Sequence, residues 1–203
     1  MSRNLVALVL AAGASTRLGQ PKQLVLYHGE RLVDRAARIA ADAGASLVFV
    51  VLGAEVDSVL QGLQQSETLR VLIHKGWAAG MAGAIALGAA AAERAGADDL
   101  LVLACDQPAV DAEHLRTLVE VSRREHVVAS VYSGRRGIPA LFPSFALHAL
   151  QGLQGDRGAR DLLQREDVMT VPLADGEFDV DTPEDLQKLR AVEAQNRGQL
   201  SPL

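Results

Sequence analysis

The chain has 203 residues, of which 49% are hydrophobic and 22% charged, as in a globular domain with a sizeable core. Its net charge of −5 and aromatic content of 3% argue against a nucleic-acid-binding protein, because such proteins usually carry basic surfaces and stacking aromatic side chains. The single cysteine excludes an internal disulfide, and no apolar run is long enough to span a membrane. We therefore expect a cytoplasmic protein, with one domain over residues 1–197 and a disordered tail over 198–203.

The first 125 residues alternate between short apolar runs and helical patterns. The apolar runs have the length and β-branched content of buried strands, and they are 5–10, 47–52, 69–73 and 100–104. Helical periodicity occupies the segments 31–43, 55–65, 79–95 and 111–125. This alternation predicts an α/β fold, a three-layer α/β/α sandwich around a mostly parallel, twisted, Rossmann-like sheet.

Shorter elements are expected after residue 125. Strands are predicted at 127–131 and 138–142, joined by a hairpin turn or a loop over 133–137, and further strands at 168–173 and 178–180. Short helices are predicted at 145–153 and 159–164. The final helix is expected to begin after Thr182, an N-cap residue that is followed by Pro183 and Asp185 at the first and third helical positions.

The first predicted strand leads directly into a loop of small residues and two cations. The loop reads Ala11-Ala12-Gly13-Ala14-Ser15-Thr16-Arg17-Leu18-Gly19-Gln20-Pro21-Lys22. Small residues let the backbone approach a ligand and direct its N–H groups at oxygen atoms, and Arg17 and Lys22 add positive charge. The spacing fits neither a P-loop nor the G-x-G-x-x-G dinucleotide fingerprint. The loop therefore predicts a polyphosphate site of another kind, the alternative being an ordinary turn whose cations face solvent.

Asp106 follows the predicted strand at 100–104, at the edge where parallel sheets bind ligands. A carboxylate beside a polyphosphate is suited to hold Mg²⁺, which prefers oxygen ligands. The alternative role, a cap for the next helix, is better filled by Asp111. The neighbouring Cys105 has no evident histidine partner, so we interpret it as a small buried residue and not as a nucleophile.

Two further carboxylates precede the last helix. Asp179 lies on the predicted strand at 178–180 and Asp181 directly follows it, so with strand alternation both are expected on one face, where either could join Asp106 in a metal site. The alternative is that Asp181 only complements the dipole of the helix that follows.

A glycine-rich segment precedes the short helix predicted at 159–164. Gly158 and the start of this helix at Ala159 offer N–H groups to an anion, and Arg157 and Arg160 add charge. The alternative is a glycine-rich turn with exposed arginines.

These segments together resemble one protein family. The loop resembles the signature L-A-A-G-x-S-x-R-[LM]-G-x-x-K of small nucleotidyltransferases with a GT-A-like fold, and is most similar to that of molybdenum cofactor cytidylyltransferases. Further similar motifs are C-D-Q-P at 105–108, G-x-P-x-L-F at 137–142, G-D-x-G-A-R at 155–160 and D-V-D-T-P-E-D at 179–185. The resemblance extends from residue 8 to about residue 188.

The resemblance implies transfer of CMP from CTP to the terminal phosphate of the molybdopterin cofactor, with Mg²⁺ and with release of pyrophosphate. It implies small-molecule substrates and a molybdenum hydroxylase that receives the product. The site residues implied are Arg17, Lys22 and Asp106 for catalysis; Leu10, Ala11, Ala12, Gly13, Ala14, Ser15, Gly80 and Met81 for the nucleotide; Gly137, Pro139, Asp156, Gly158 and Arg160 for the acceptor; and Asp106 with Asp181 or Asp179 for the metal.

Some positions depart from the family pattern. Residues 82–84 are Ala-Gly-Ala where the family usually has serines, His74 replaces a common asparagine, and Ile138 replaces a frequent histidine. Three alternatives therefore remain open. They are guanylyl transfer, transfer to another phosphorylated acceptor such as a sugar or isoprenoid phosphate, and a non-catalytic carrier of molybdopterin or nucleotide.

Overall fold

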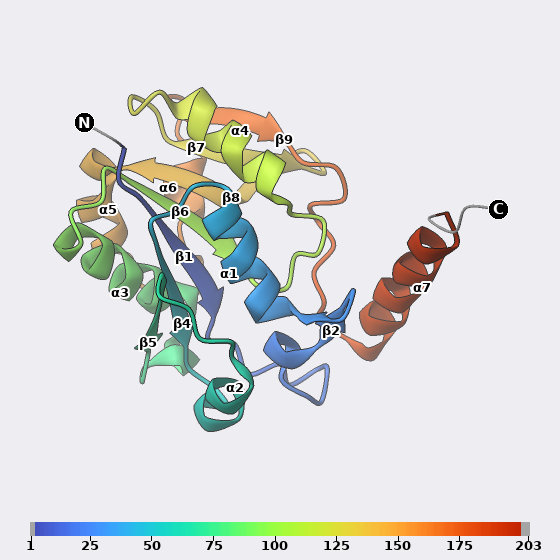
Figure 1. The fold of residues 1–203 in the computed structure, drawn as a ribbon. Helices are drawn as coiled ribbons and strands as arrows, with labels where there is room; N and C mark the ends of the chain where they lie inside the picture. Colours follow the sequence, from blue (N-terminus) through green and yellow to red (C-terminus); the bar gives the residue numbers. More distant parts are fainter. Residues whose placement is uncertain (1–2, 200–203) are drawn as a thin grey trace.

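The computed structural model describes residues 3–199, with side chains described for residues 3–195. Seven strands form one sheet in the order β5-β4-β1-β6-β8-β7-β9 (Figure 1). They are β1 (Leu5–Ala11), β4 (Leu47–Leu52), β5 (Leu69–Ile73), β6 (Asp99–Ala104), β7 (Val128–Tyr132), β8 (Arg135–Pro143) and β9 (Met169–Pro172). Within this sheet β8 alone runs antiparallel to its neighbours. The sheet is therefore mostly parallel, as the alternating pattern predicts.

Helices cover both faces of the sheet and make two hydrophobic cores (Figure 1). One face carries α1 (Leu32–Asp42), α2 (Val56–Gly62) and α4 (Ala112–Ser122). The other carries α3 (Met81–Arg94), α5 (Leu147–Gln151) and α6 (Arg160–Leu163). Val9 packs into the first core and Leu8 into the second, and both are fully buried. Burial on both faces explains the uninterrupted apolar runs in the sequence, and the three-layer α/β/α prediction is confirmed.

A third, smaller core joins the early loop region to the end of the chain. It contains Tyr27 of the short hairpin that β2 (Leu26–Tyr27) forms with β3 (Glu30–Arg31). Leu32 of α1 and Leu189 of α7 (Pro183–Gln199) pack in the same core. Beyond this contact α7 extends away from the rest of the molecule (Figure 1). Of the predicted tail 198–203, the first two residues belong to α7, and residues 200–203 lie outside the described part of the chain.

Two helix starts form as the sequence predicts. Asp111 caps α4 by accepting a 2.8 Å hydrogen bond from the backbone N–H of His114. Before α7, Thr182 accepts a 3.2 Å hydrogen bond from the N–H of Asp185, whose carboxylate accepts one of 3.1 Å from the N–H of Thr182. This reciprocal capping box fixes the start of α7, and with it the position of Asp181.

The strand predicted at 178–180 is wrong. The backbone N–H of Val180 donates one 3.0 Å hydrogen bond to the carbonyl of Asp106. The N–H of Phe178, two residues earlier, donates instead to the nearby carbonyl of Asp175, so no strand ladder forms. The strand geometry expected to hold Asp179 and Asp181 on one face is therefore absent. Their positions are set by the contact with Asp106 on one side and by the start of α7 on the other.

Two smaller boundaries also differ from expectation. Of the hairpin or loop predicted over 133–137, the structure forms the hairpin, and its turn is shorter than that range: it is Ser133–Gly134, both with positive φ, and β8 begins at Arg135. The helix predicted at 79–95 begins at Met81, because a 3-10 turn, Trp77–Ala79, and Gly80 with φ of +112° precede it.

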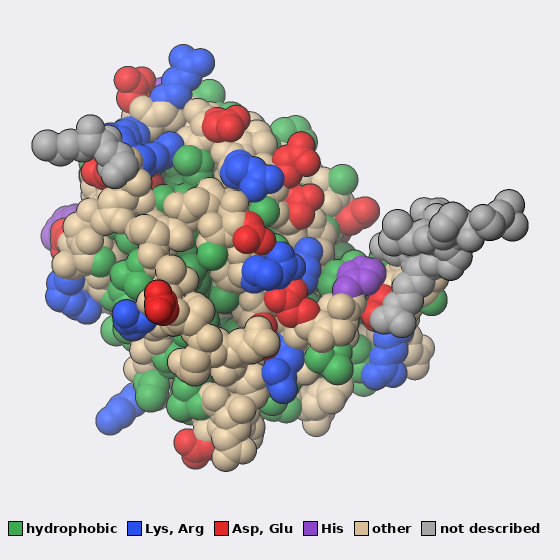
Figure 2. Space-filling model, viewed as in Figure 1, with side chains coloured by type: hydrophobic (Ala, Val, Ile, Leu, Met, Phe, Trp, Pro, Cys, Tyr) green, Lys and Arg blue, Asp and Glu red, His purple; other side chains and the backbone are tan. Residues whose placement is uncertain are grey.

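Positively and negatively charged side chains are interspersed over the face of the molecule shown in Figure 2. Among the described residues, no helix combines the length and the apolar character that crossing a membrane would require.

Candidate active site

The loop that follows β1 is fixed by two polar side chains. Gln23 is buried, and its amide donates hydrogen bonds of 2.7 Å and 3.0 Å to the carbonyls of Ala11 and Gly13. Ser15 accepts a 3.0 Å hydrogen bond at its Oγ from the backbone N–H of Lys22, which closes the loop. These hydrogen bonds tie the loop backbone at Ala11, Gly13 and Lys22.

Lys22 lies at the centre of a charged cluster formed by Arg17, Lys22, Asp106 and Asp181. Its ammonium group donates hydrogen bonds to Asp106 and, over 2.8 Å, to Asp181. Arg17 donates a 2.8 Å hydrogen bond to the other carboxylate oxygen of Asp181. Burial alone would lower the pKa of Lys22, but the carboxylates of Asp106 and Asp181 outweigh it and raise the pKa above its usual value. Lys22 is therefore a fixed positive charge at this edge of the sheet.

Parallel register explains why Asp106 reaches this cluster. Leu10 near the end of β1 pairs with Ala104 at the end of β6, and Cys105 donates a 3.2 Å hydrogen bond to the carbonyl of Leu10. Asp106 therefore emerges beside the loop after β1. Cys105 itself is buried, which raises the pKa of its thiol and agrees with a structural role.

Asp179 is the third carboxylate at this edge, and its environment differs from that of Asp181. Partial desolvation and the nearby carboxylates of Asp106 and Asp181 raise the pKa of Asp179 to about 7. Asp181 accepts a hydrogen bond from the same Lys22 ammonium group as Asp106, whereas Asp179 lines a neighbouring cleft.

That cleft, of about 450 Å³, lies beside the charged cluster, and Asp106 belongs to both. Four arginines from β8 and from the segment around the start of α6 line it: Arg135, Arg136, Arg157 and Arg160. The other lining residues are Met81, Ile85, Ala104, Gln107, Tyr132, Gly137, Ile138, Asp156, Ala159, Leu163, Gln164, Glu177 and Asp179. Because Asp106, Asp156, Glu177 and Asp179 line the cleft too, it carries charges of both signs beside apolar walls. Such a lining suits a ligand that has a ring system, polar groups and a phosphate for the arginines.

The segment expected to approach the nucleotide contacts the segment expected to approach the acceptor. Ala82 donates a 3.2 Å hydrogen bond to the carbonyl of Gly155. A Cβ at Gly80 would lie 2.6 Å from that carbonyl oxygen, so the close approach depends on glycine. Gly158 also packs closely, against the side chain of Met81: a Cβ at position 158 would lie 3.1 Å from the Met81 sulfur.

The structure thus assembles most of the predicted site residues at one edge. Leu10 and Ala11 are the buried last residues of β1, so their backbone alone can face a ligand, while the loop carries Ala12, Gly13, Ala14 and Ser15. Among the predicted acceptor residues, Gly137, Asp156 and Arg160 line the cleft, but Pro139 and Gly158 are buried and do not line it.

Several residues of the cleft are not predicted from the sequence. Gln107 is buried, and its amide donates a 3.1 Å hydrogen bond to the carbonyl of Gly176, which holds the segment before Asp179. Tyr132, Arg135 and Arg136 come from the β7–β8 hairpin. Gln107 stands inside the C-D-Q-P motif and could have been noticed there, whereas no motif marks the hairpin residues.

Two departures from the family pattern meet in space. The ring of His74, which follows β5, packs over Gly83 in α3: a Cβ at Gly83 would lie 2.6 Å from His74 Nε2. The histidine therefore occupies the room that a serine at position 83 would need.

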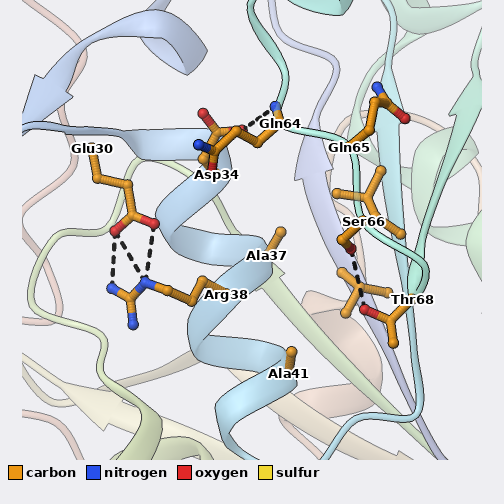
Figure 3. Close-up of a pocket in the computed structure, with 11 residues that line it drawn as sticks. Glu30, Asp34, Ala37, Arg38, Ala41, Gln64, Gln65, Ser66 and Thr68 are labelled. Carbon is orange, nitrogen blue, oxygen red and sulfur yellow. Dashed lines mark hydrogen bonds and ion pairs between the residues drawn. The ribbon is translucent and has the colours of Figure 1, made fainter.

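A second hollow, of about 250 Å³, lies between α1 and the segment that leads into β5 (Figure 3). Its charged side chains are already paired: Glu30 bonds to Arg38 at 2.9–3.2 Å, and Asp34 accepts a 2.9 Å hydrogen bond from the N–H of Gln64. It contains none of the residues of the charged cluster.

The carboxylates of the charged cluster fit a divalent metal that substrate would help to hold. Among the residues that the structure describes, no three or more His, Cys, Asp or Glu side chains form a metal-binding group on their own. Mg²⁺ is commonly held by one or two carboxylates, with phosphates and water completing its shell. Asp106 and Asp181 already share one cation, the ammonium of Lys22.

Residues 7–170 match the family described as the MobA-like NTP transferase domain. The chain belongs to this family. It is therefore a nucleotidyltransferase, and the charged cluster lies in the matched region except for Asp181.

Related proteins cover most of this MobA-like chain. It is 32% identical to nicotine blue oxidoreductase of Paenarthrobacter nicotinovorans, over 91% of this chain and 96% of that protein. It is 33% identical to a probable molybdenum cofactor guanylyltransferase of Opitutus terrae, over 72% of each chain. The structure of Rv0371c from Mycobacterium tuberculosis in complex with manganese superposes with a TM-score of 0.74, at 25% identity, over 92% of this chain and 97% of that one.

Proposed function

We propose that this MobA-like transferase moves CMP from CTP to the terminal phosphate of the molybdopterin cofactor and releases pyrophosphate. The observation that carries the proposal is the position of Lys22, held between Asp106 and Asp181 beside a cleft lined by four arginines. Cations on a fixed loop suit a triphosphate, and the adjoining cleft suits a second, anionic substrate.

The reaction needs placement and charge, not a protein nucleophile. An oxygen of the acceptor phosphate attacks the α-phosphorus of CTP in line, forming a new P–O bond, while the bond between the α-phosphorus and the bridging oxygen breaks and its electron pair leaves with pyrophosphate. Arg17 and Lys22 neutralise charge that develops on the leaving group, and backbone N–H groups near Gly13 and Ala14 hold phosphate oxygens. Loop geometry fixed by Gln23 and Ser15 keeps these groups in position.

Asp106 and Asp181 are the proposed ligands of a divalent metal. When bound, Mg²⁺ would neutralise phosphate charge and help to orient the triphosphate. Lys22 bonds to both carboxylates, which favours Asp181 over Asp179 as the partner of Asp106. The manganese complex of Rv0371c supports divalent-metal binding in a related protein.

The choice of nucleotide rests on two opposing observations. The L-A-A-G and C-D-Q-P motifs resemble those of cytidylyl-transferring members and favour CTP. A relative named as a probable molybdenum cofactor guanylyltransferase favours GTP as the second candidate. We propose CTP, because the motifs that favour it border the nucleotide loop and Asp106.

Pyrophosphate release tests this proposal. The protein is incubated with Mg²⁺ and CTP, GTP, ATP or UTP, each with and without the molybdopterin cofactor. Release that depends on the cofactor and is confined to CTP is the expected result, and confinement to GTP would replace CTP by the second candidate. No release from any nucleotide by a folded protein that binds the cofactor would contradict catalysis and favour a carrier.

A further inference from the structure

An irregularity in the β7–β8 pairing shapes one wall of the cleft. Ala129 pairs with Ala140, but Ser130, the next residue of β7, pairs with Gly137, so Ile138 and Pro139 are extra residues on β8. Such a bulge leaves backbone groups without their usual ladder partners. Gly137 and Ile138 both line the cleft, so the course of the bulge determines the shape of that wall.

Side chains of β7 replace the missing ladder bonds. The Ser130 hydroxyl donates a 2.6 Å hydrogen bond to the carbonyl of Pro139, and the Tyr132 hydroxyl donates one of 3.1 Å to the carbonyl of Ile138. Tyr132 packs tightly on Gly137, where a Cβ would lie 2.3 Å from its hydroxyl oxygen. Two successive carbonyls of the bulge are therefore held by specific donors.

A third residue lies behind Ser130. The Nε2 atom of His114, in α4, lies 2.7 Å from the Ser130 hydroxyl oxygen. Since the single Ser130 proton is donated to Pro139, this contact requires that His114 carry a proton on Nε2 and donate it. Burial lowers the pKa of His114, which favours the neutral ring. The result is a directed chain of hydrogen bonds from α4 through a fully buried serine to the bulge.

We propose that His114 and Ser130, neither of which lines the cleft, are positioning residues: they hold the bulge at Ile138–Pro139, and with it the cleft wall Gly137–Ile138, in the shape that receives the acceptor. The inference deepens the proposed function and rests on it for the identity of the acceptor. A serine buried in the core costs stability unless its hydroxyl is paired, and here the hydroxyl is paired with His114 on one side and with the Pro139 carbonyl of the bulge on the other. The expected effect of breaking the chain is weaker acceptor binding with unchanged nucleotide binding.

Four variants test this proposal: Ser130→Ala, His114→Leu, His114→Gln and Thr117→Val. His114→Gln retains an N–H donor close to the position of Nε2. Thr117→Val is the matched control in α4, because the Thr117 hydroxyl bonds only locally, to the carbonyl of Glu113. The first readout, on ligand-free protein, is hydrogen exchange of the peptide that covers β8. Exchange there is expected to rise about tenfold in Ser130→Ala and His114→Leu and to stay unchanged in the other two variants.

The second readout is the KM for each substrate. In Ser130→Ala and His114→Leu, the KM for the molybdopterin cofactor is expected to rise about fivefold to tenfold, as when one buried hydrogen bond is lost, while the KM for CTP stays the same. Unchanged exchange in β8, an unchanged acceptor KM or an equal rise in both KM values would overturn the inference. If the wild-type protein transfers nothing to the cofactor, the proposed function fails, and the exchange measurement still decides whether His114 and Ser130 hold the wall.

Discussion

Lys22 donates a 2.8 Å hydrogen bond to Asp181, a residue 159 positions later in the chain. The contact joins the loop after β1 to the segment that leads into α7, and Asp106 at the end of β6 completes it. Three distant parts of the sequence therefore supply one charged cluster, whose carboxylates and ammonium group can exchange partners when a metal and a triphosphate bind.

Replacing Lys22 by methionine keeps the length of the side chain and removes its charge. We expect turnover to fall by about 10²-fold or more, the scale for losing one electrostatic contact to the reacting phosphates. Without nucleotide, the same variant is expected to bind Mn²⁺ more tightly, because the ammonium no longer competes for Asp106 and Asp181. Electron paramagnetic resonance of Mn²⁺ measures this binding. Lys188→Met, at an exposed lysine of α7, is the control; weaker Mn²⁺ binding in Lys22→Met would contradict the account.

The three carboxylates at the sheet edge are predicted to differ in metal binding. Asp106→Asn and Asp181→Asn should each weaken Mn²⁺ binding in the presence of nucleotide by about tenfold or more, since each removes a charged ligand. Asp179→Asn should have a smaller effect, because Asp179 faces the cleft and does not share Lys22. Titration of the three variants side by side measures this order, and a larger loss in Asp179→Asn than in Asp181→Asn would reverse the assignment.

The raised pKa of Asp179 predicts a pH dependence of stability. In the folded protein this carboxyl has a raised pKa of about 7, whereas in the unfolded chain it ionises near the ordinary aspartate pKa of 3.8. Between about pH 4 and pH 7 the folded state binds more protons at this group, so its contribution to the free energy of unfolding falls as pH rises. Asp179→Asn has no such titration, so the free energy of unfolding of the variant should rise relative to that of wild type as pH increases from about 4 to about 7. Urea unfolding without metal at pH 4.5, 6 and 7.5 measures the difference, which a pH-independent offset would contradict.

Most of the fold could be predicted from the sequence, because buried strands and amphipathic helices leave clear periodic patterns. The proximity of the loop after β1 to Asp106 could also be predicted from the sequence, since parallel strands end at the same edge of a sheet. The strand expected at 178–180 could not be corrected from the sequence: its alternation of apolar and acidic residues is strand-like, and a single hydrogen bond from Val180 to Asp106 replaces the ladder. The roles of Ser130 and Gln107 depend on contacts between distant segments that no local pattern reveals.

His74 and Gly83 fit against each other, because the His74 ring lies where a side chain at position 83 would begin. Gly83→Ser should destabilise the protein by about 1 kcal/mol, the low end of the range for overpacking, because the new Cβ would meet the far end of the His74 side chain, which has to turn away. Adding His74→Asn should recover most of this loss. Thermal unfolding of both single variants and the double variant forms a double-mutant cycle. Additive effects would show that the two residues are not coupled.

A label on the α-phosphate of CTP follows nucleotidyl transfer to a phosphorylated acceptor without intermediate steps. Wild-type protein, Asp106→Asn and Thr117→Val are incubated with the labelled nucleotide, Mg²⁺ and the molybdopterin cofactor. Wild type and Thr117→Val are expected to move the label to the cofactor with one pyrophosphate per transfer, and folded Asp106→Asn is expected to be at least about 10²-fold slower. Label that stays on free nucleotide in all three samples, or a folded Asp106→Asn with normal transfer, would contradict the proposed reaction and the role of Asp106.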